Sequence, residues 1–346
     1  MEIVDVRPQD KNFWNKFIKA HYPPVGAFMQ TWEWGLFQET LGRKIERHLI
    51  IENHEPIAVF TLVHHKLPLG FSYGYIPRGP VVAKYASEES KYLEILKTLR
   101  FWAQKNLSSL AFIRLEPPLS YLTSTINQHG FYTPSYYIQP KKNHTVLLEK
   151  DEQDILAKFH PSTRSNINRA QKRGVTIEIK SKLRPDEYKE FLVMAQDTIR
   201  RNNGKNAYPE DSYFQAMLKT IPPPAEIYDP LNLSLNIFFG YQYQRPAAAH
   251  FVLYFNNTAT YLYGASYSKY LSSKVTTHLH WTAMQKAKRM GLNYYDLGGV
   301  DETRWPTLTN FKRQFRGEEI NYIGNIDIPL RLFLHQTYDF FRRWKQ

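Results

Sequence analysis

Three cations, Lys312, Arg313 and Arg316, lie close together in the aromatic segment 310–317 (NFKRQFRG), which also contains Phe311. A run of cations most often forms a solvated loop. Two aromatic rings in the same short segment favour partial burial instead. A buried ammonium interacts more strongly with a nearby negative charge because its surroundings are less polarisable. The segment is therefore a candidate for stabilising an anion that forms during a reaction.

A second group of cations, Arg200, Arg201 and Lys205, lies in a stretch with glycine and asparagine that is predicted to be a loop. The guanidinium group of arginine presents a planar fork of donors that matches the oxygens of a phosphate. We therefore expect this group, or the segment around Lys312, to hold a diphosphate.

A third group of cations follows the predicted helix 160–173 (HPSTRSNINRAQKR), which a serine or threonine can cap at its start and Gly174 can end. Its basic residues include Arg164, Arg169 and Lys172. A solvated helix face and an RNA-binding face explain this pattern equally well.

The segment 296–301 (DLGGVD) ends a predicted strand with a tight Gly-Gly turn. Such a turn either needs glycine because its backbone has a positive φ, or it presents backbone amides to a substrate at the end of the strand. The sequence leaves both interpretations open.

Several kinds of site are excluded. The chain has no cysteine, which excludes disulfides, thiolate metal sites and cysteine nucleophiles. His278 and His280 stand two apart on a predicted helix, where such side chains face different directions, so a shared metal ion is not expected. Gly204 and Lys205 resemble the end of a phosphate-binding loop, but Ile199 stands where its first glycine belongs.

The composition indicates a folded protein with an anionic partner. Aromatic residues make up 15% of the 346 residues, so the chain can bury enough apolar surface to offset its conformational entropy. The 45 basic and 32 acidic residues give a net charge of +13, which favours nucleic acid, a diphosphate or an anionic membrane surface as partner. The charged N-terminal segment does not resemble a signal peptide, and no apolar run is long enough to span a bilayer. A soluble cytoplasmic protein is expected.

The elements that must position these residues occur in the same order twice: three antiparallel strands, a helix and one more strand. The first set comprises strands 47–52, 57–65, 71–76 and 111–115 with helix 87–105, and the second comprises strands 235–239, 247–255, 258–263 and 294–297 with helix 277–290. This repetition predicts an α+β fold.

The repetition also predicts two similar units, 1–149 and 150–321, packed around a cleft. The tail, 322–346, is amphipathic and basic. We expect it to pack back on the first unit, and contact with a membrane surface is the second interpretation.

Eight segments taken together resemble the Fem transferases, the family that forms the peptide bridges of peptidoglycan. Each segment alone is a weak signal, but together they follow the family's order through nearly the whole chain. They are 28–35 (FMQTWEWG), 41–43 (LGR), 74–80 (GYIPRGP), 114–117 (RLEP), 160–167 (HPSTRSNI) with 174–175, 261–266 (YLYGAS), 295–300 (YDLGGV) and 311–315 (FKRQF).

The resemblance implies two acetyltransferase-like units and an aminoacyl transfer from aminoacyl-tRNA to the side-chain amine of the stem peptide of a peptidoglycan precursor. That precursor is lipid-linked or UDP-linked, and peripheral contact with the inner membrane surface is compatible with both. No glycine-rich loop precedes the helices that begin near residues 87 and 277, so neither coenzyme A nor another cofactor is expected. The chain has no heptad pattern long enough for the charged helical hairpin of some relatives, and it resembles the compact members. A monomer is expected.

The resemblance also assigns roles to single residues. Lys312 matches the lysine of the family's Phe-Lys-x-x-Phe segment and is expected to stabilise negative charge on the ester carbonyl or the nucleotide end. Glu116 stands where relatives carry an acidic residue before proline and is expected to accept or relay the amine's proton, with the substrate itself as the alternative. Tyr263 fits a tyrosine of the precursor site. The other predicted residues are Phe311, Arg78, Arg200, Arg201 and Lys205 for the precursor, and Arg164, Arg169, Lys172, Arg313 and Arg316 for tRNA.

Two other functions stay open from the sequence. One is an N-acyltransferase of the same fold that uses an acyl thioester and a small amine. The other is an RNA-binding protein without catalysis, which only the charge and the aromatic content favour. The basic residues are dispersed and no RNA-recognition motif of standard spacing is present, and both observations argue against it. The sequence does not determine which amino acid is transferred.

Overall fold

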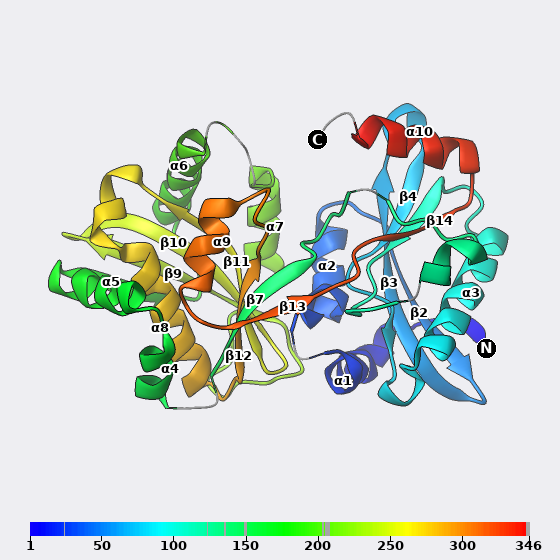
Figure 1. The fold of residues 1–346 in the computed structure, drawn as a ribbon, viewed down its shortest axis with the longest axis horizontal. Helices are drawn as coiled ribbons and strands as arrows, with labels where there is room; N and C mark the ends of the chain where they lie inside the picture. Colours follow the sequence, from blue (N-terminus) through cyan, green and yellow to red (C-terminus); the bar gives the residue numbers. More distant parts are fainter. Residues whose placement is uncertain are drawn as a thin grey trace. The chain divides into compact units, whose positions relative to one another are not determined.

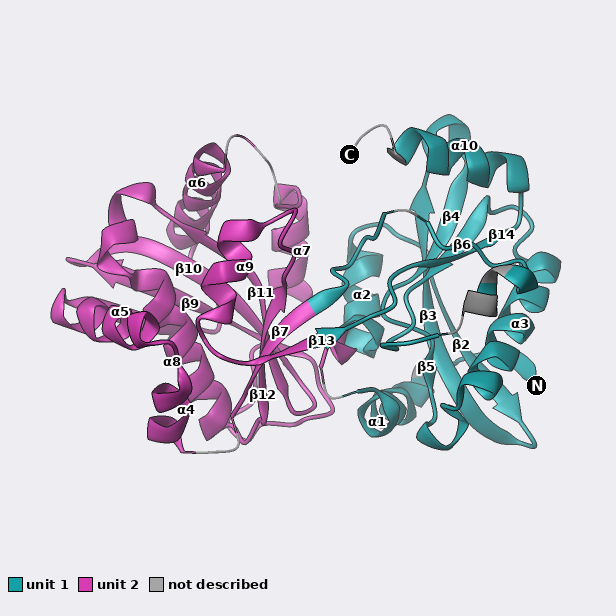
Figure 2. Cartoon of the chain, viewed as in Figure 1, with its two compact units in different colours: residues 1–23, 29–142, 320–346 teal, residues 24–28, 143–319 magenta. Residues whose placement is uncertain are grey.

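The computed structural model of the chain describes residues 1–23, 25–122, 124–134, 136–148, 151–202, 204 and 208–343. The chain forms two compact units (Figure 2). Unit 1 comprises residues 1–23, 29–142 and 320–346, and unit 2 comprises residues 24–28 and 143–319. The tail that contains the last helix therefore belongs to unit 1.

Unit 1 is built on a mixed sheet with the strand order β1-β2-β3-β4-β6-β14, and β5 pairs with β3 (Figure 1). Neighbouring strands are antiparallel except β4 and β6, which pair in parallel from Gly74 with Ile113 to Ile76 with Leu115. The strands are β1 (Glu2–Asp5), β2 (Ile45–Glu52), β3 (Glu55–Lys66), β4 (Ser72–Ile76), β5 (Val81–Val82), β6 (Phe112–Leu115) and β14 (Ile326–Pro329). The helices are α1 (Lys11–His21), α2 (Trp32–Thr40), α3 (Glu89–Asn106) and α10 (Leu332–Arg343).

A buried ion pair fixes the C-terminal segment to unit 1. Arg114 on β6 donates two hydrogen bonds, of 2.7 and 2.6 Å, to the carboxylate of Asp327 on β14. Asp327 also bonds His335 on α10 at 2.9 Å. All three side chains are buried, so the pairing of β14 and the packing of α10 depend on the same carboxylate.

Unit 2 is built on a second mixed sheet, with the strand order β13-β7-β12-β11-β10-β9-β8. Its strands are β7 (Lys142–Leu147), β8 (Val175–Lys180), β9 (Ser234–Gln242), β10 (Arg245–Phe255), β11 (Thr258–Ser266), β12 (Tyr294–Gly299) and β13 (Glu318–Asn321). The helices are α4 (Glu152–Lys158), α5 (Pro161–Lys172), α6 (Pro185–Arg201), α7 (Asp211–Thr220), α8 (Val275–Arg289) and α9 (Pro306–Arg313). Short 3₁₀ helices occur in both units. They are η1 (Pro8–Asp10), η2 (Ala27–Gln30), η3 (Pro68–Gly70), η4 (Lys84–Ala86), η5 (Ser124–His129) and η6 (Ser268–Ser273).

Helices cover both faces of the second sheet. Successive side chains of β10 point to opposite faces, and nearly all of them are buried. Val252 belongs to the core beneath α8, against which α5 also packs. The neighbouring Phe251 faces the other way and packs against Phe191 on α6 and Phe214 on α7. The two series of strands and a helix predicted from the sequence are confirmed, with β2, β3, β4, α3 and β6 in unit 1 and β9, β10, β11, α8 and β12 in unit 2.

The parallel strands β11 and β12 pair over a short stretch only. Thr258, Ala259 and Thr260 pair with Tyr294, Tyr295 and Asp296, after which β11 continues to Ser266 and β12 to Gly299. Backbone groups beyond this stretch are therefore not used in a ladder between these two strands.

No helix in the described part of the chain combines the length and the apolar composition that a bilayer crossing requires.

Candidate functional site

The side chain of Lys312 ends beside the turn that follows β12. Its Nζ donates a 2.7 Å hydrogen bond to the carbonyl oxygen of Gly299, and the side chain is buried. Helix α9 holds it there: Pro306 begins the helix, and the hydroxyl of Thr309 both donates to the carbonyl and accepts from the amide of Asp301. Burial lowers the pKa of Lys312 to about 8, although the charge of Asp296 acts to raise it.

Asp296 supplies the negative charge of this site. Its side chain is fully buried and accepts a 2.9 Å hydrogen bond from the Asn143 amide and a 2.7 Å bond from the backbone N–H of Gly298. Gly298 has φ +78°, a conformation that strongly favours glycine. The interpretation of the Gly-Gly turn as one that needs a positive φ is confirmed at Gly298. The Gly298 amide bonds Asp296.

Two buried oxygens on the neighbouring strand β7 lack a partner among the described residues: Oδ1 of Asn143 and Oγ1 of Thr145. Thr145 is in register with Asp296, and Asn143 is in register with Gly299. Buried polar atoms nearly always have a hydrogen-bond partner, from protein, water or ligand. Two acceptors beside Asp296 are therefore not satisfied by the described residues.

An aromatic cluster lies on the α8 side of the same strands. The ring of His280 on α8 lies 4.4 Å from that of His250 and 4.6 Å from that of Tyr261, centroid to centroid. His280 Nδ1 shares a 3.1 Å hydrogen bond with the hydroxyl of Tyr295. Burial lowers the pKa of His250 to about 3. Burial also lowers the pKa of His280, and the neighbouring His250 and Lys312 lower it further. Both rings are neutral at pH 7, so Lys312 carries the positive charge of the cluster.

A β-bulge separates the two tyrosines of β11. Val252 pairs with Tyr261 and Phe251 pairs with Tyr263, which leaves Leu262 between them as the extra residue. Tyr261 and Tyr263 therefore point to opposite faces, although residues two apart on a regular strand share a face. Tyr263 packs 5.1 Å from Phe214 on α7, whereas Tyr261 joins the cluster around His280.

Glu116 and Arg78 lie together in unit 1. Both are buried. The carboxylate of Glu116 accepts hydrogen bonds of 2.6 Å from the Tyr75 hydroxyl and 3.0 Å from the amide of Gln139. Arg78, with φ +49°, lies 3.6 Å over the ring of Tyr322. Burial would lower the pKa of Arg78, but Tyr322 and Glu116 raise it.

Comparison with known proteins identifies the family. A model of the FemAB family matches residues 10–146, 128–228 and 236–343. The chain belongs to the FemAB family. It is similar to the "Lipid II:glycine glycyltransferase" of Staphylococcus saprophyticus, with 22% identity over 391 residues that cover 92% of each chain.

Solved structures show the same fold for this FemAB protein. The crystal structure of FemX has a TM-score of 0.77 and 19% identity, and it covers 98% of this chain and 100% of its own. A tandem GNAT protein from the clavulanic acid biosynthesis pathway has a TM-score of 0.55 and 10% identity, and it covers 95% and 98% of the two chains. The predicted fold of two acetyltransferase-like α+β units is confirmed. The predicted cleft between the units stays a prediction.

The residues predicted to act on the substrates fall into both units of the FemAB chain. Lys312, Tyr263 and Phe311 belong to unit 2, whereas Glu116 and Arg78 belong to unit 1. Phe311 lies 5.7 Å from the ring of His280. Tyr263 lies on the face of the second sheet away from His280, so within unit 2 the structure brings Phe311, and not Tyr263, to Lys312.

The predicted phosphate group of residues 200–205 differs from residue to residue. The Arg201 guanidinium donates to the carbonyl oxygen and to the hydroxyl of Ser266, both at 3.1 Å, and to the hydroxyl of Ser268 at 3.1 Å. Arg200 is exposed and lies 3.5 Å from Asp197. Lys205 lies outside the described residues. Arg200 therefore has the more accessible guanidinium of the two.

The cations predicted to bind tRNA also differ in their contacts. Arg169 and Lys172 are exposed on α5, where they line a shallow groove with Ser165, Asn168 and Arg173. Arg164 donates to the carbonyl oxygens of Ala157 and Phe159. Arg313 is ion-paired with Glu302 and Glu319, and Arg316 is exposed. Of these residues, Arg169, Lys172 and Arg316 present their side chains to solvent.

Sequence analysis missed Asn143, Thr145, His250 and Tyr261 as neighbours of this site. Tyr261 stood in a recognised segment, but regular alternation would have placed it on the same face as Tyr263. Asn143 and Thr145 had no motif of their own, because their strand reaches β12 only through the fold. No group of three or more potential metal ligands is present in the part of the chain that the structure describes.

Proposed function

We propose that this FemAB protein transfers an aminoacyl group from aminoacyl-tRNA to the side-chain amine of the stem peptide of a peptidoglycan precursor. The single observation that carries the proposal is the buried ammonium of Lys312 in a chain of this family. It is fixed to Gly299 at the end of β12, beyond the stretch in which β12 pairs with the parallel strand β11. The relative from Staphylococcus saprophyticus, named for glycine transfer to lipid II, supports the same class of reaction. Since aminoacyl-tRNA is made in the cytoplasm, we propose that the protein acts there, as a monomer.

The reaction makes one amide and breaks one ester. The nitrogen lone pair of the acceptor amine attacks the ester carbonyl carbon, and the carbonyl oxygen becomes an oxyanion. The C–O bond to the terminal ribose then breaks, and that ribose oxygen leaves with a proton. The amine loses one proton in the process, so the sum of protons is unchanged. The enzyme must therefore orient an amine, stabilise an oxyanion and move a proton.

Lys312 has the properties that the oxyanion requires. With a pKa of about 8 it is mostly protonated at neutral pH. Its surroundings are buried and have a neutral His280 beside them, so its charge is weakly screened. We assign Lys312 to stabilising the negative charge on the ester carbonyl or on the leaving ribose oxygen.

The proton of the acceptor amine needs a separate acceptor. Glu116 is the proposed relay, and the 2.6 Å hydrogen bond from Tyr75 gives it a path through that hydroxyl. The substrate itself is the alternative acceptor. A Glu116→Gln variant that retains full transfer would favour the substrate.

The exposed cations are the proposed contacts to the two polyanionic substrates. Arg169, Lys172 and Arg316 are assigned to tRNA and Arg200 to the precursor's phosphates, because their side chains are exposed. Arg164, Arg201 and Arg313 are assigned supporting roles, since their guanidinium groups already bond the protein. The buried Arg78 and the half-buried Phe311 and Tyr263 are proposed to shape the precursor site, and Lys205 keeps its predicted phosphate role.

The test is a transfer assay with purified protein, a mixture of radiolabelled aminoacyl-tRNAs and either lipid-linked or UDP-linked precursor. Label on the stem peptide, abolished by ribonuclease treatment of the donor, is expected. No label with any amino acid and either acceptor would overturn the proposal. The likeness to a tandem GNAT protein favours a second candidate, transfer from an acyl thioester. Labelling from coenzyme A thioesters that is insensitive to ribonuclease would support that candidate instead.

Catalysis and RNA binding are separated by one variant. Lys312→Met is expected to abolish transfer and to leave the affinity for tRNA unchanged, because the side chain is buried and does not contribute to an exposed basic surface. Loss of tRNA binding together with transfer would mean that Lys312 contributes to tRNA binding, and a parent chain that binds tRNA without any transfer would favour the RNA-binding interpretation.

A further inference from the structure

The outer face of helix α10 exposes aromatic side chains to solvent. The inner face holds the helix in place: His335 bonds Asp327 at 2.9 Å, and Tyr338 packs 5.0 Å from the ring of Phe112. On the outer face, Phe333 is 78% exposed and Phe341 is 60% exposed. Leu332 and Phe340 are exposed as well. A helix with one apolar face packed and a second one solvated has a surface for another apolar phase.

A loop of unit 1 adds a further exposed apolar side chain. Leu69, in η3 between β3 and β4, has φ +60° and is 92% exposed. A left-handed backbone costs free energy for any residue with a Cβ, and glycine or asparagine normally occupies it. A leucine at this position neither relieves the strain nor gains buried area within the chain.

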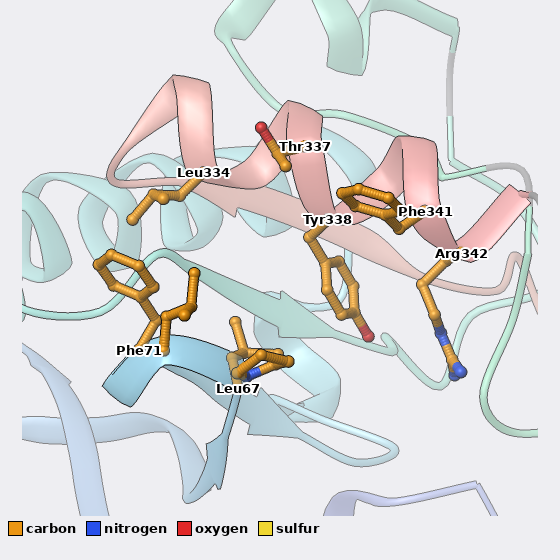
Figure 3. A pocket seen from close by; sticks show the side chains of 9 residues that line it. Leu67, Phe71, Leu334, Thr337, Tyr338, Phe341 and Arg342 are labelled. Carbon is orange, nitrogen blue, oxygen red and sulfur yellow. The ribbon is translucent and has the colours of Figure 1, made fainter.

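The loop and the helix form the two walls of one apolar groove (Figure 3). Leu67, Leu69 and Phe71 line one wall, and Leu334, Tyr338 and Phe341 are among the residues of the other. The groove has a volume of about 470 Å³. Figure 3 shows Phe71 and Leu334 at one end, with Tyr338 and Arg342 toward the other. Phe341 of α10 and Leu69 of the loop line this groove together, and Phe333 is exposed on the same helix outside the groove. We call the groove and the exposed apolar side chains of α10 the α10 surface.

Basic side chains accompany the α10 surface. Lys66 precedes the loop, Arg331 precedes the helix and Arg342 lines the groove, and all three are exposed. Asp339 is the single acidic residue in the sequence of α10, and it is half-buried. The surface therefore joins exposed phenylalanine and leucine to an excess of positive charge, in a chain whose net charge is +13.

We propose that the α10 surface binds the headgroup region of a bilayer that contains anionic phospholipid. Phe333, Phe341 and Leu69 enter the boundary between headgroups and acyl chains, as the apolar residues of interfacial helices do. Lys66, Arg331 and Arg342 contact lipid phosphates, whose negative surface potential attracts basic residues within a Debye length. A bilayer would explain the strained backbone of Leu69. The left-handed conformation directs the leucine side chain into solvent, where only a lipid layer could bury it.

This inference does not depend on the proposed transfer reaction, because its test measures binding to lipid and needs no substrate. The full chain is sedimented with vesicles of phosphatidylcholine, with and without phosphatidylglycerol, at low and at high salt. Binding is expected to the vesicles that contain phosphatidylglycerol and to weaken as salt rises.

Matched variants distinguish vesicle binding through the α10 surface from non-specific binding through exposed residues elsewhere. Phe333→Ser with Phe341→Ser is expected to weaken vesicle binding by about tenfold or more, through the loss of two inserted rings. Phe101→Ser is the control, because Phe101 is 73% exposed on α3 of the same unit. It is expected to bind vesicles as the parent chain does. Lys66→Gln is likewise compared with Lys97→Gln, which removes an exposed charge from α3.

Leu69→Gly tests the loop without risk to the fold. Glycine accepts the positive φ of this position, so the melting temperature is expected to stay the same or to rise while vesicle binding falls. Equal sedimentation of the parent, the double phenylalanine variant and Leu69→Gly would overturn the proposal. So would a dimer in the absence of vesicles that the double variant dissociates, since the α10 surface would then join two copies of the chain.

Discussion

The Nζ of Lys312 donates its 2.7 Å hydrogen bond to the carbonyl oxygen of Gly299, thirteen residues earlier in the chain. The contact joins helix α9 to the end of β12, where the parallel pairing with β11 has already stopped. One backbone carbonyl and the more distant charge of Asp296 are modest compensation for a buried ammonium. The pKa of Lys312 is lowered because burial disfavours the ammonium more than these two contacts favour it.

Replacing Lys312 is expected to separate stability from activity. Lys312→Met keeps the length of the side chain and removes the desolvated charge, so the free energy of unfolding at pH 7 should rise by up to about 3 kcal/mol. Transfer should fall by at least about two orders of magnitude, as when one oxyanion contact is lost. Denaturant titration and the transfer assay measure the two effects. Lower stability with normal transfer would contradict both expectations.

The same charge gives a pH dependence with a definite direction. The pKa of Lys312 is lowered from 10.5 to about 8 by burial, so between these values the unfolded chain holds the proton that the folded chain has lost. Stability should therefore increase as pH rises from about 8 toward 10.5 and should be lowest below 8, apart from other groups. The increase is expected to be absent in Lys312→Met.

Activity should follow the opposite direction over the same range. Because the protonated form of Lys312 is the proposed catalytic form, this group should lower kcat as pH rises above about 8. The acceptor amine acts in the opposite direction, because a lysine-type amine with a pKa of about 10.4 becomes more reactive as it loses its proton. Lys312→Arg stays protonated, so the ratio of the parent's single-turnover rate to the rate of Lys312→Arg removes the contribution of the amine and should fall above about pH 8. A ratio that is constant to pH 10 would exclude a role for the ammonium.

Periodicity in the sequence predicted the order of strands and helices because side chains within one element alternate with a fixed period. It could not predict the bulge at Leu262, which reverses the faces of Tyr261 and Tyr263 after one extra residue. Nor could it predict that Arg201 is bonded to Ser266, because such a contact depends on how α6 lies on β11. Residue types identified the cations of the site, and tertiary contacts determine which of them are accessible.

Arg200 and Arg201 are adjacent in sequence, yet their replacement should have different effects. Arg201→Gln loses hydrogen bonds to Ser266 and Ser268 and should lower the free energy of unfolding by about 1–2 kcal/mol. Arg200→Gln should leave stability within about 0.5 kcal/mol. If Arg200 binds a phosphate, its replacement should weaken precursor affinity more at low than at high salt. Equal affinity of parent and Arg200→Gln at every ionic strength would remove Arg200 from the site.

The exposed cations of α5 are expected to act through charge. Arg169→Gln with Lys172→Gln should weaken tRNA binding uniformly across tRNA species, and should reduce the slope of log affinity against log salt by about 1.5–2. Lys182→Gln with Lys189→Gln is the control, because it removes the same charge from exposed positions elsewhere in unit 2. An equal reduction in both double variants would show that net charge, and not α5, attracts the tRNA.

The ion pair of Arg114 and Asp327 should be the most sensitive pair in unit 1. Both side chains are fully buried, so Asp327→Asn leaves an uncompensated guanidinium and should cost about 3–5 kcal/mol. It should also speed amide exchange in α10, because Asp327 bonds His335 of that helix. Glu52→Gln, which breaks the more exposed pair with Lys91, should cost less than about 1 kcal/mol. The double variant Arg114→Met with Asp327→Leu removes both charges, so it should be less destabilised than Asp327→Asn alone. A double variant that is as unstable as Asp327→Asn would mean that the two charges stabilise unit 1 beyond cancelling each other's desolvation.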